Sequence, residues 1–195
     1  AKILLPETQQ SETADGADQK VQAETTNALD AMCQGASDGM KLTLNVLAML
    51  IGFTAAIALL NYLIVLPQNW IGVNAPITFD QILGWLNAPF AWLMGVPWVD
   101  CDAIGQALGK RIVFTEFIGY MEITSLKETL DPRSFTLATF AICGFANFAS
   151  IAIQIGGIGS LAPERRADLA SLGLRAMAGG ILVGYTNACI AGLFL

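Results

Sequence analysis

The stretch CGFANFASIAIQIGGIGSL, residues 143–161, decides the fold, because amide groups lie near the middle of an otherwise apolar segment. The apolar run 135–161 carries no formal charge and is long enough to cross a bilayer as a helix. On a helix, Asn147, Ser150 and Gln154 fall on one face. Such a face must meet other protein or an aqueous cavity, and the glycines that follow are expected to loosen the helix and free backbone groups for a ligand. The alternative is that these polar groups bond neighbouring helices as purely structural contacts.

The composition around this segment is that of a membrane protein. Of the 195 residues, 54% are hydrophobic and 13% are charged, and the charges concentrate in the N-terminal region and in short connecting stretches. Two more apolar runs, 42–66 and 172–195, are long enough to span a bilayer. We therefore expect an all-α integral membrane protein that crosses the lipid bilayer several times.

Other classes of function are disfavoured by what the chain contains. It has no histidine, which excludes histidine-based nucleophile activation and histidine-ligated metal sites within this chain. The four cysteines have no CxxC spacing and are interpreted as small apolar residues. A net charge of −6 without a basic run argues against nucleic acid as a partner. We expect no enzyme, no catalytic residue and no metal site in this chain.

The N-terminal third divides into three segments. Residues 1–40 are interpreted as the end of a preceding span followed by an acidic cytoplasmic loop, so we expect the protein to extend upstream. Residues 41–66 form the first complete transmembrane helix, a scaffold helix. Residues 67–99 contain all four tryptophans and four prolines, a pattern typical of an amphipathic segment in the membrane interface.

The segment 100–128 predicts a helical hairpin. Its charged residues in the apolar part are Lys110, Arg111, Glu116 and Glu122. They make a simple span unfavourable, whereas a re-entrant hairpin with its turn near VFTEF would enter and leave by one face. Irregular backbone at membrane depth is tolerated only beside protein or water, so the hairpin implies a cavity.

The C-terminal third is predicted to hold a broken transmembrane helix, 133–162, and then a cytoplasmic turn and last transmembrane helix, 163–195. The turn carries Arg165 and Arg166, which favours the cytoplasmic side. Small residues recur every four positions in the last span and indicate close helix packing. The GIGSLA match to a dinucleotide-binding pattern lacks a strand before it and is interpreted as chance.

Several of these stretches resemble the concentrative nucleoside transporter family. The match is carried by CGFANFASIAIQIGGIGSLAPERRADLASLGLRAM, by GKRIVFTEFIGY and by GMKLTLNVLAMLIGFTAAIALLNYL, and it covers nearly the whole chain. The resemblance implies an all-helical homotrimer in the cell (inner) membrane. It implies two inverted repeats, each with a hairpin and a broken helix, and uptake of nucleosides coupled to sodium or, in some members, to protons.

The resemblance also assigns candidate substrate-binding residues. The ribose-binding carboxylate corresponds to Glu116, and the ribose-binding amide and hydroxyl correspond to Asn147 and Ser150, while Phe145 matches an aromatic side chain close to the substrate. A carboxylate can accept hydrogen bonds from two vicinal hydroxyls, and an amide both donates and accepts. Gln154 is a weaker candidate, and Glu122 is interpreted as structural.

The chain matches the C-terminal half of such a transporter. In the family, the upstream half carries the nucleobase contacts and the sodium ligands, so no cofactor is expected here and sodium is expected as the coupling ion of the missing half. The predicted function is a secondary active transporter that takes up nucleosides by cation symport with alternating access, this chain supplying the ribose-binding half of the site. The alternative is a non-transporting membrane scaffold or assembly subunit.

Overall fold

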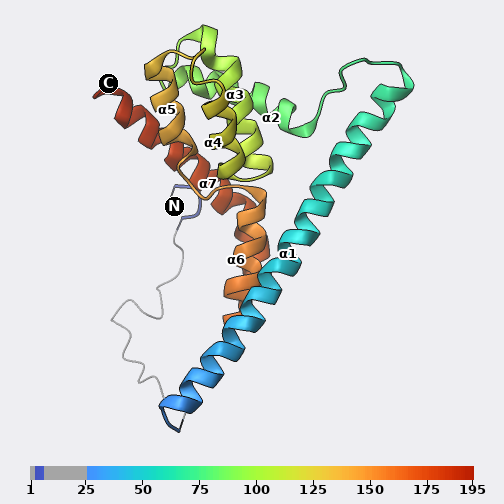
Figure 1. Cartoon of the computed structure of the whole chain (residues 1–195), viewed down its shortest axis with the longest axis vertical. Coiled ribbons are helices and arrows are strands. Elements are labelled where there is room, and N and C mark those ends of the chain that lie inside the picture. Colours follow the sequence, from blue (N-terminus) through green and yellow to red (C-terminus); the bar gives the residue numbers. More distant parts are fainter. Residues whose placement is uncertain (1–2, 7–25) are drawn as a thin grey trace.

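The described part of the chain is built of helices. The structure is a computed structural model, and it describes residues 3–6 and 26–195 (Figure 1). These ranges contain no strand, so the prediction of an all-α chain is confirmed for them. The elements are α1 (Ala28–Trp70), α2 (Phe79–Leu93), α3 (Trp98–Val113), α4 (Glu116–Ser125), α5 (Pro132–Ile142), α6 (Phe148–Leu161), the 3₁₀ turn η1 (Pro163–Arg165) and α7 (Arg166–Gly192).

Helix α1 is long and lies along the side of the molecule. Asn27 begins it by accepting a hydrogen bond from the backbone N–H of Asp30 at 2.9 Å. This cap starts the helix at Ala28, earlier than the predicted boundary at residue 41, and residues 7–25 of the predicted acidic loop lie outside the described residues. All residues of α1 are described, and none is buried against the described chain. Its main neighbour is α6 (Figure 1).

Helices α2 and α3 pack with their backbones in direct contact. The buried positions of α2 recur every three or four residues and are Asp80, Gly84, Asn87 and Ala91. A Cβ added to Gly105 of α3 would lie only 2.6 Å from the carbonyl oxygen of Gly84, so the close approach requires glycine. Trp85 and Trp92 lie on the outer face of α2 and are exposed.

Helices α3 and α4 form a helical hairpin. Phe114 and Thr115 join the two helices, within the predicted VFTEF stretch. An ion pair of 2.7 Å between Lys110 and Glu122 connects the two helices. Both side chains of this pair are partly exposed. The turn places Glu116 at the first position of α4.

The apolar run 135–161 is interrupted, but not where the glycines suggest. Helix α5 ends at Ile142 and α6 begins at Phe148, so the break precedes the glycines. The expectation that the glycines loosen the helix is wrong, because Gly156 and Gly159 lie inside α6 and serve packing. A Cβ on Gly156 would lie 3.3 Å from the carbonyl oxygen of Asn45 in α1.

Helix α7 packs along α5 and α6 through small residues. A Cβ on Gly184 would lie 2.9 Å from the carbonyl oxygen of Ala141, so the predicted role of the small residues in close packing is confirmed at this position. The buried hydroxyl of Tyr185 donates a hydrogen bond to the side-chain oxygen of Asn87 and thereby connects α7 to α2.

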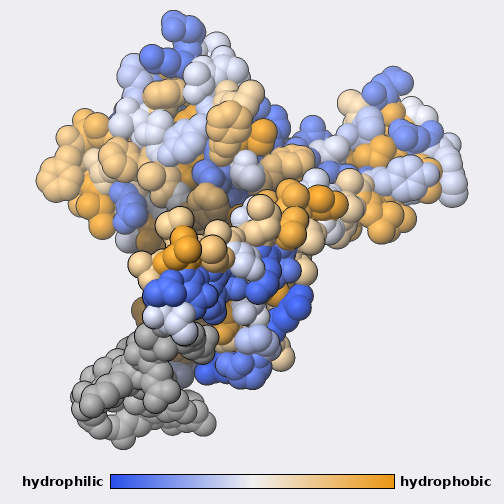
Figure 2. Space-filling view, turned by 60° about the horizontal axis from the view of Figure 1, so that its bottom comes forward, coloured by the Kyte–Doolittle hydropathy of each residue, from blue (hydrophilic) through white to orange (hydrophobic). Residues whose placement is uncertain are grey.

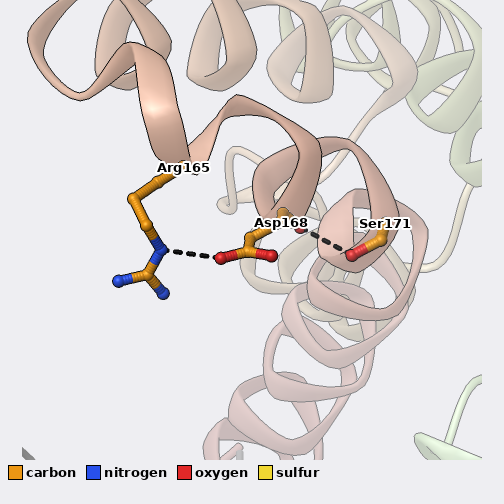
Figure 3. A network of polar contacts seen from close by, with 3 residues as sticks. All are labelled: Arg165, Asp168 and Ser171. Atoms are coloured by element: carbon orange, nitrogen blue, oxygen red, sulfur yellow. Dashed lines mark hydrogen bonds and ion pairs between the residues drawn. The ribbon is translucent and has the colours of Figure 1, made fainter.

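The start of α7 is stabilised by exposed polar contacts (Figure 3). The guanidinium Nε of Arg165 donates to a carboxylate oxygen of Asp168 at 2.6 Å. The hydroxyl of Ser171 donates to the backbone carbonyl of Asp168 at 2.8 Å. These local contacts lie at the turn between α6 and α7, at the end of α6 that is remote from the break.

Two stretches are long and apolar enough to cross a membrane: α1, and the stretch Pro163–Gly192 that contains α7. Hydrophobic side chains are exposed over much of the face drawn in Figure 2. Exposed hydrophobic residues of these two stretches include Ile51 and Leu63 of α1 and Val183 and Ile190 of α7. Exposed apolar side chains along such helices are typical of a surface that faces lipid or other apolar protein.

Candidate functional site

The N-termini of two helices bring Glu116 and Asn147 together. Glu116 is the first residue of α4, and Asn147 is the N-cap of α6. The side-chain amide of Asn147 donates from Nδ2 to Oε2 of Glu116 at 2.9 Å. Because each helix carries partial positive charge at its N-terminus, this is a favourable place for a carboxylate. Two residues separated by 31 positions thus form one polar pair.

Ser150 holds the amide of Asn147 in place. The backbone N–H of Ser150 donates to Oδ1 of Asn147 at 2.7 Å, and the hydroxyl of Ser150 accepts from the backbone N–H of Asn147 at 3.1 Å. The Ser150 hydroxyl also donates to the Asn147 carbonyl oxygen at 2.6 Å. This reciprocal arrangement is a capping box. Asn147 therefore lies before the first residue of the helix. The prediction that Asn147 shares a helical face with Ser150 and Gln154 is wrong.

Phe145 and Gln154 line a cavity to which Ser150 also contributes. The cavity between α6 and α7 has a volume of about 380 Å³, and Phe145, Ser150 and Gln154 are among the residues that line it. Phe145 belongs to the break between α5 and α6 and is 65% exposed. The structure thus brings Glu116, Asn147 and Ser150 into one hydrogen-bonded group and places Phe145 next to it in the chain. Glu122 lies apart, since it pairs with Lys110.

Sequence reasoning did not assign Arg111 to the site. The Arg111 side chain is fully buried, and its Nη2 donates to the backbone carbonyl oxygen of Gly144 at 2.9 Å. Its Nε and Nη1 have no hydrogen-bond partner among the described residues. A signal was present in the sequence, because an arginine inside an apolar segment is costly and generally has a specific partner.

The pair combines a hydrogen-bond acceptor with hydrogen-bond donors. Glu116 offers carboxylate oxygens as acceptors, and the helix N-termini offer donors. Within 3–6 and 26–195, no group of three or more acidic or cysteine residues is placed to hold a metal ion.

Comparison with known proteins gives the site a context. A family model described as "Na+ dependent nucleoside transporter C-terminus" matches residues 1–192. "Uncharacterized transporter YutK" of Bacillus subtilis (strain 168) is 39% identical over 195 residues, which are 100% of this chain and 48% of that protein. "Sodium/nucleoside cotransporter 1" of Rattus norvegicus is 33% identical over 212 residues, covering 99% of this chain and 32% of that protein. The chain spans about half the length, or less, of these curated relatives.

Solved structures of CNTnw have the same fold. A double variant of CNTnw in an outward-facing state is 37% identical and superimposes with a TM-score of 0.86, covering 99% of this chain and 46% of that chain. CNTnw in an inward-facing substrate-bound state is also 37% identical and gives a TM-score of 0.68, again covering 99% of this chain and 46% of that one. The arrangement of the helices in this chain is therefore more similar to that outward-facing structure than to that inward-facing structure.

Proposed function

The chain belongs to the Na+-dependent nucleoside transporter family, and from this we propose that it forms half of a secondary active transporter that takes up nucleosides by cation symport. Sodium is the proposed coupling ion, held by residues of the other half. This chain supplies the part of the site that binds the ribose. Access to the site alternates between the two sides of the membrane.

The observation that carries this proposal is the hydrogen bond between Asn147 and Glu116. It joins a carboxylate acceptor to an amide donor at the point where two helices begin. A carboxylate of this kind can accept from vicinal hydroxyls of a ribose, and Asn147 can exchange its bond to Glu116 for a bond to the sugar. Ser150 supports the amide through the cap, and Phe145 offers an exposed aromatic face.

The placement of the helices in the membrane is part of the same proposal. We propose that α1 and α7 cross the bilayer, that α2 lies in the interface, and that α3 and α4 form a re-entrant hairpin. Helices α5 and α6 form a broken membrane helix. In the break Ala146 and Asn147 are buried, whereas Cys143 and Phe145 are exposed, so this part of the break is proposed to line a water-filled cavity or to meet the other half of the protein. The turn at 163–165 is cytoplasmic, and the protein is a homotrimer of the cell (inner) membrane.

A direct test of the transport proposal is the uptake of labelled uridine by proteoliposomes that contain the intact protein. We expect accumulation driven by an inward sodium gradient and its loss when the gradient is dissipated. The control is the same preparation without protein. If neither uridine nor adenosine accumulates under sodium or proton gradients while the protein is folded and correctly inserted, the transport proposal is wrong.

One observation favours a second candidate, a non-transporting membrane scaffold or assembly subunit. The polar atoms of Asn147 and Ser150 already satisfy one another through the capping box and the bond to Glu116. Polar groups that satisfy one another in this way are also expected in a purely structural contact. The scaffold predicts that uridine is neither bound nor taken up.

Two substitutions of Asn147 separate its role as a cap from its bond to Glu116. Asn147→Ala removes both and should lower stability by ~1 kcal/mol as well as weaken uridine binding. Asn147→Ser retains a cap acceptor but cannot reach Glu116 as an amide donor, so we expect stability to return toward that of the unaltered protein while uridine binding stays weak. Thermal unfolding and equilibrium binding of the detergent-solubilised protein measure the two effects. Full recovery of binding in Asn147→Ser would show that the cap alone matters.

A further inference from the structure

We infer that Arg111 is a positioning residue that holds the break between α5 and α6, and with it the Asn147–Glu116 pair, in the geometry that binds sugar hydroxyls. The inference rests on the proposed function and adds a residue to the site. Arg111 acts through Gly144 and Glu116 and needs no contact with the substrate itself.

The first support is the position of the acceptor. Arg111 donates to the carbonyl oxygen of Gly144, which also accepts from the backbone N–H of Ala146 at 2.9 Å. Gly144 lies three residues before Asn147, inside the break. Fixing this carbonyl restricts the chain that leads into the α6 cap. By holding this carbonyl, the guanidinium of Arg111 therefore helps to fix the position of the Asn147 side chain.

The second support is the way the arginine is seated. Glycines of three separate segments approach it closely: a Cβ on Gly119 would lie 3.0 Å from the Arg111 Cβ, and one on Gly144 would lie 3.1 Å from its Nη2. A Cβ on Gly184 of α7 would lie 3.9 Å from the same Nη2. Helix α4, the break and α7 thus meet around one side chain. Such confinement leaves the guanidinium few alternative positions.

The third support is electrostatic. A fully buried guanidinium is costly without a compensating charge, and the described residues form no ion pair with Arg111 within 4 Å. The titratable side chains around it are Glu116, Tyr120, Cys143 and Tyr185. Of these, Glu116 carries the carboxylate. The attraction between the Arg111 guanidinium and this carboxylate favours the position in which Asn147 donates to Glu116.

The unpaired donors complete the argument. Leaving a buried N–H without an acceptor is unfavourable, and both Nε and Nη1 of Arg111 lack an acceptor among the described residues. If Arg111 served packing alone, an apolar residue of similar size in its place would leave the protein equally stable or make it more stable. A buried charge with these unpaired donors, in the electrostatic field of the proposed ligand-binding carboxylate, points to a role in positioning the site.

The test compares binding of uridine and 2′,3′-dideoxyuridine to the intact protein and to variants. Uridine carries the two ribose hydroxyls and the analogue lacks them, so the ratio of their dissociation constants reports on the Glu116–Asn147 pair. We expect a ratio of about tenfold or more for the unaltered protein. In Arg111→Met the ratio should fall toward one, and in Arg111→Lys, which keeps the charge, a large part of it should remain.

A matched control is Arg133→Met. Arg133 also donates from Nη2 to a glycine carbonyl, that of Gly192, at 2.7 Å, but it is exposed and lies at the opposite end of α5 from the break. Its ratio should equal that of the unaltered protein. If Arg111→Met does not fold, Gly144→Ala tests the same contact, since the added Cβ must displace the guanidinium by a few tenths of an ångström, and its ratio should fall as well.

The outcomes separate the inference from the function on which it rests. If the unaltered protein binds neither uridine nor adenosine, the proposed function is wrong and the inference falls with it. If uridine binds with the expected ratio, and Arg111→Met or Gly144→Ala keeps that ratio, the function stands and Arg111 is purely structural. A loss of protein yield or stability at constant ratio overturns the inference in the same way.

Discussion

Replacing Glu116 with glutamine in the intact protein should weaken uridine binding by ~5- to 150-fold, which corresponds to about 1–3 kcal/mol. Glutamine keeps an oxygen that can accept from Nδ2 of Asn147, so the contact between α4 and α6 should survive. What is lost is the negative charge, and with it the stronger, charge-assisted bonds to ribose hydroxyls. Equilibrium binding of labelled uridine measures the effect.

Glu122→Gln is the control for this experiment. Glu122 lies on the same helix, but its carboxylate pairs with Lys110 at a partly exposed position. Its substitution should change stability by less than about 1 kcal/mol and leave uridine affinity unaltered. Equal affinities for Glu116→Gln and the unaltered protein would remove Glu116 from the binding site.

Replacing Gly105 with alanine should destabilise the protein by ~1–3 kcal/mol or more, because the added methyl group would overlap the backbone of the neighbouring helix. The new Cβ would lie 2.6 Å from the carbonyl oxygen of Gly84 and 2.9 Å from the backbone nitrogen of Ala88. Both neighbours are backbone atoms, so relief requires α2 and α3 to separate. Thermal unfolding of the solubilised intact protein measures the loss.

Gly35→Ala is the matched control. Gly35 is also a helical glycine, but no atom lies within 4 Å of the position that its Cβ would take. Alanine there should be neutral or stabilising by up to about 1 kcal/mol, because glycine is a poor helix former. If Gly105→Ala unfolds at the same temperature as Gly35→Ala, α2 and α3 are not packed through their backbones as described.

Part of the site could be predicted from the sequence, and the remainder depended on long-range contacts. The resemblance of TEF and FANFAS to a known family selected Glu116, Asn147 and Ser150, and the structure groups these three. Hydrophobic periodicity could not locate the break, since apolar residues continue through it. A local signal did exist, because Asn147 followed by Ser150 three positions later is a helix-start pattern.

The glycines and Arg111 show why the other details were not predictable. A glycine inside an apolar run can break a helix or permit close packing, and only the neighbouring helix decides between them, as Asn45 of α1 does for Gly156. Similarly, the acceptor of Arg111 is a main-chain carbonyl 33 residues further along, which no side-chain pattern reveals. The early start of α1 at Ala28 depends on the Asn27 cap within a polar stretch that resembles a loop.

The bond between Arg111 and Gly144 also bears on how the chain is inserted during its synthesis. An isolated arginine at the centre of a membrane helix adds ~2.5–3.5 kcal/mol to the free energy of entering the bilayer from the translocation channel. The carbonyl that accepts the hydrogen bond from Arg111 leaves the ribosome later than α3 does, because Gly144 follows α3 in the chain. We therefore expect α3 to stay in contact with the channel or with other protein until the segment between α5 and α6 has been synthesised. Residues 98–147 are then expected to enter the bilayer together.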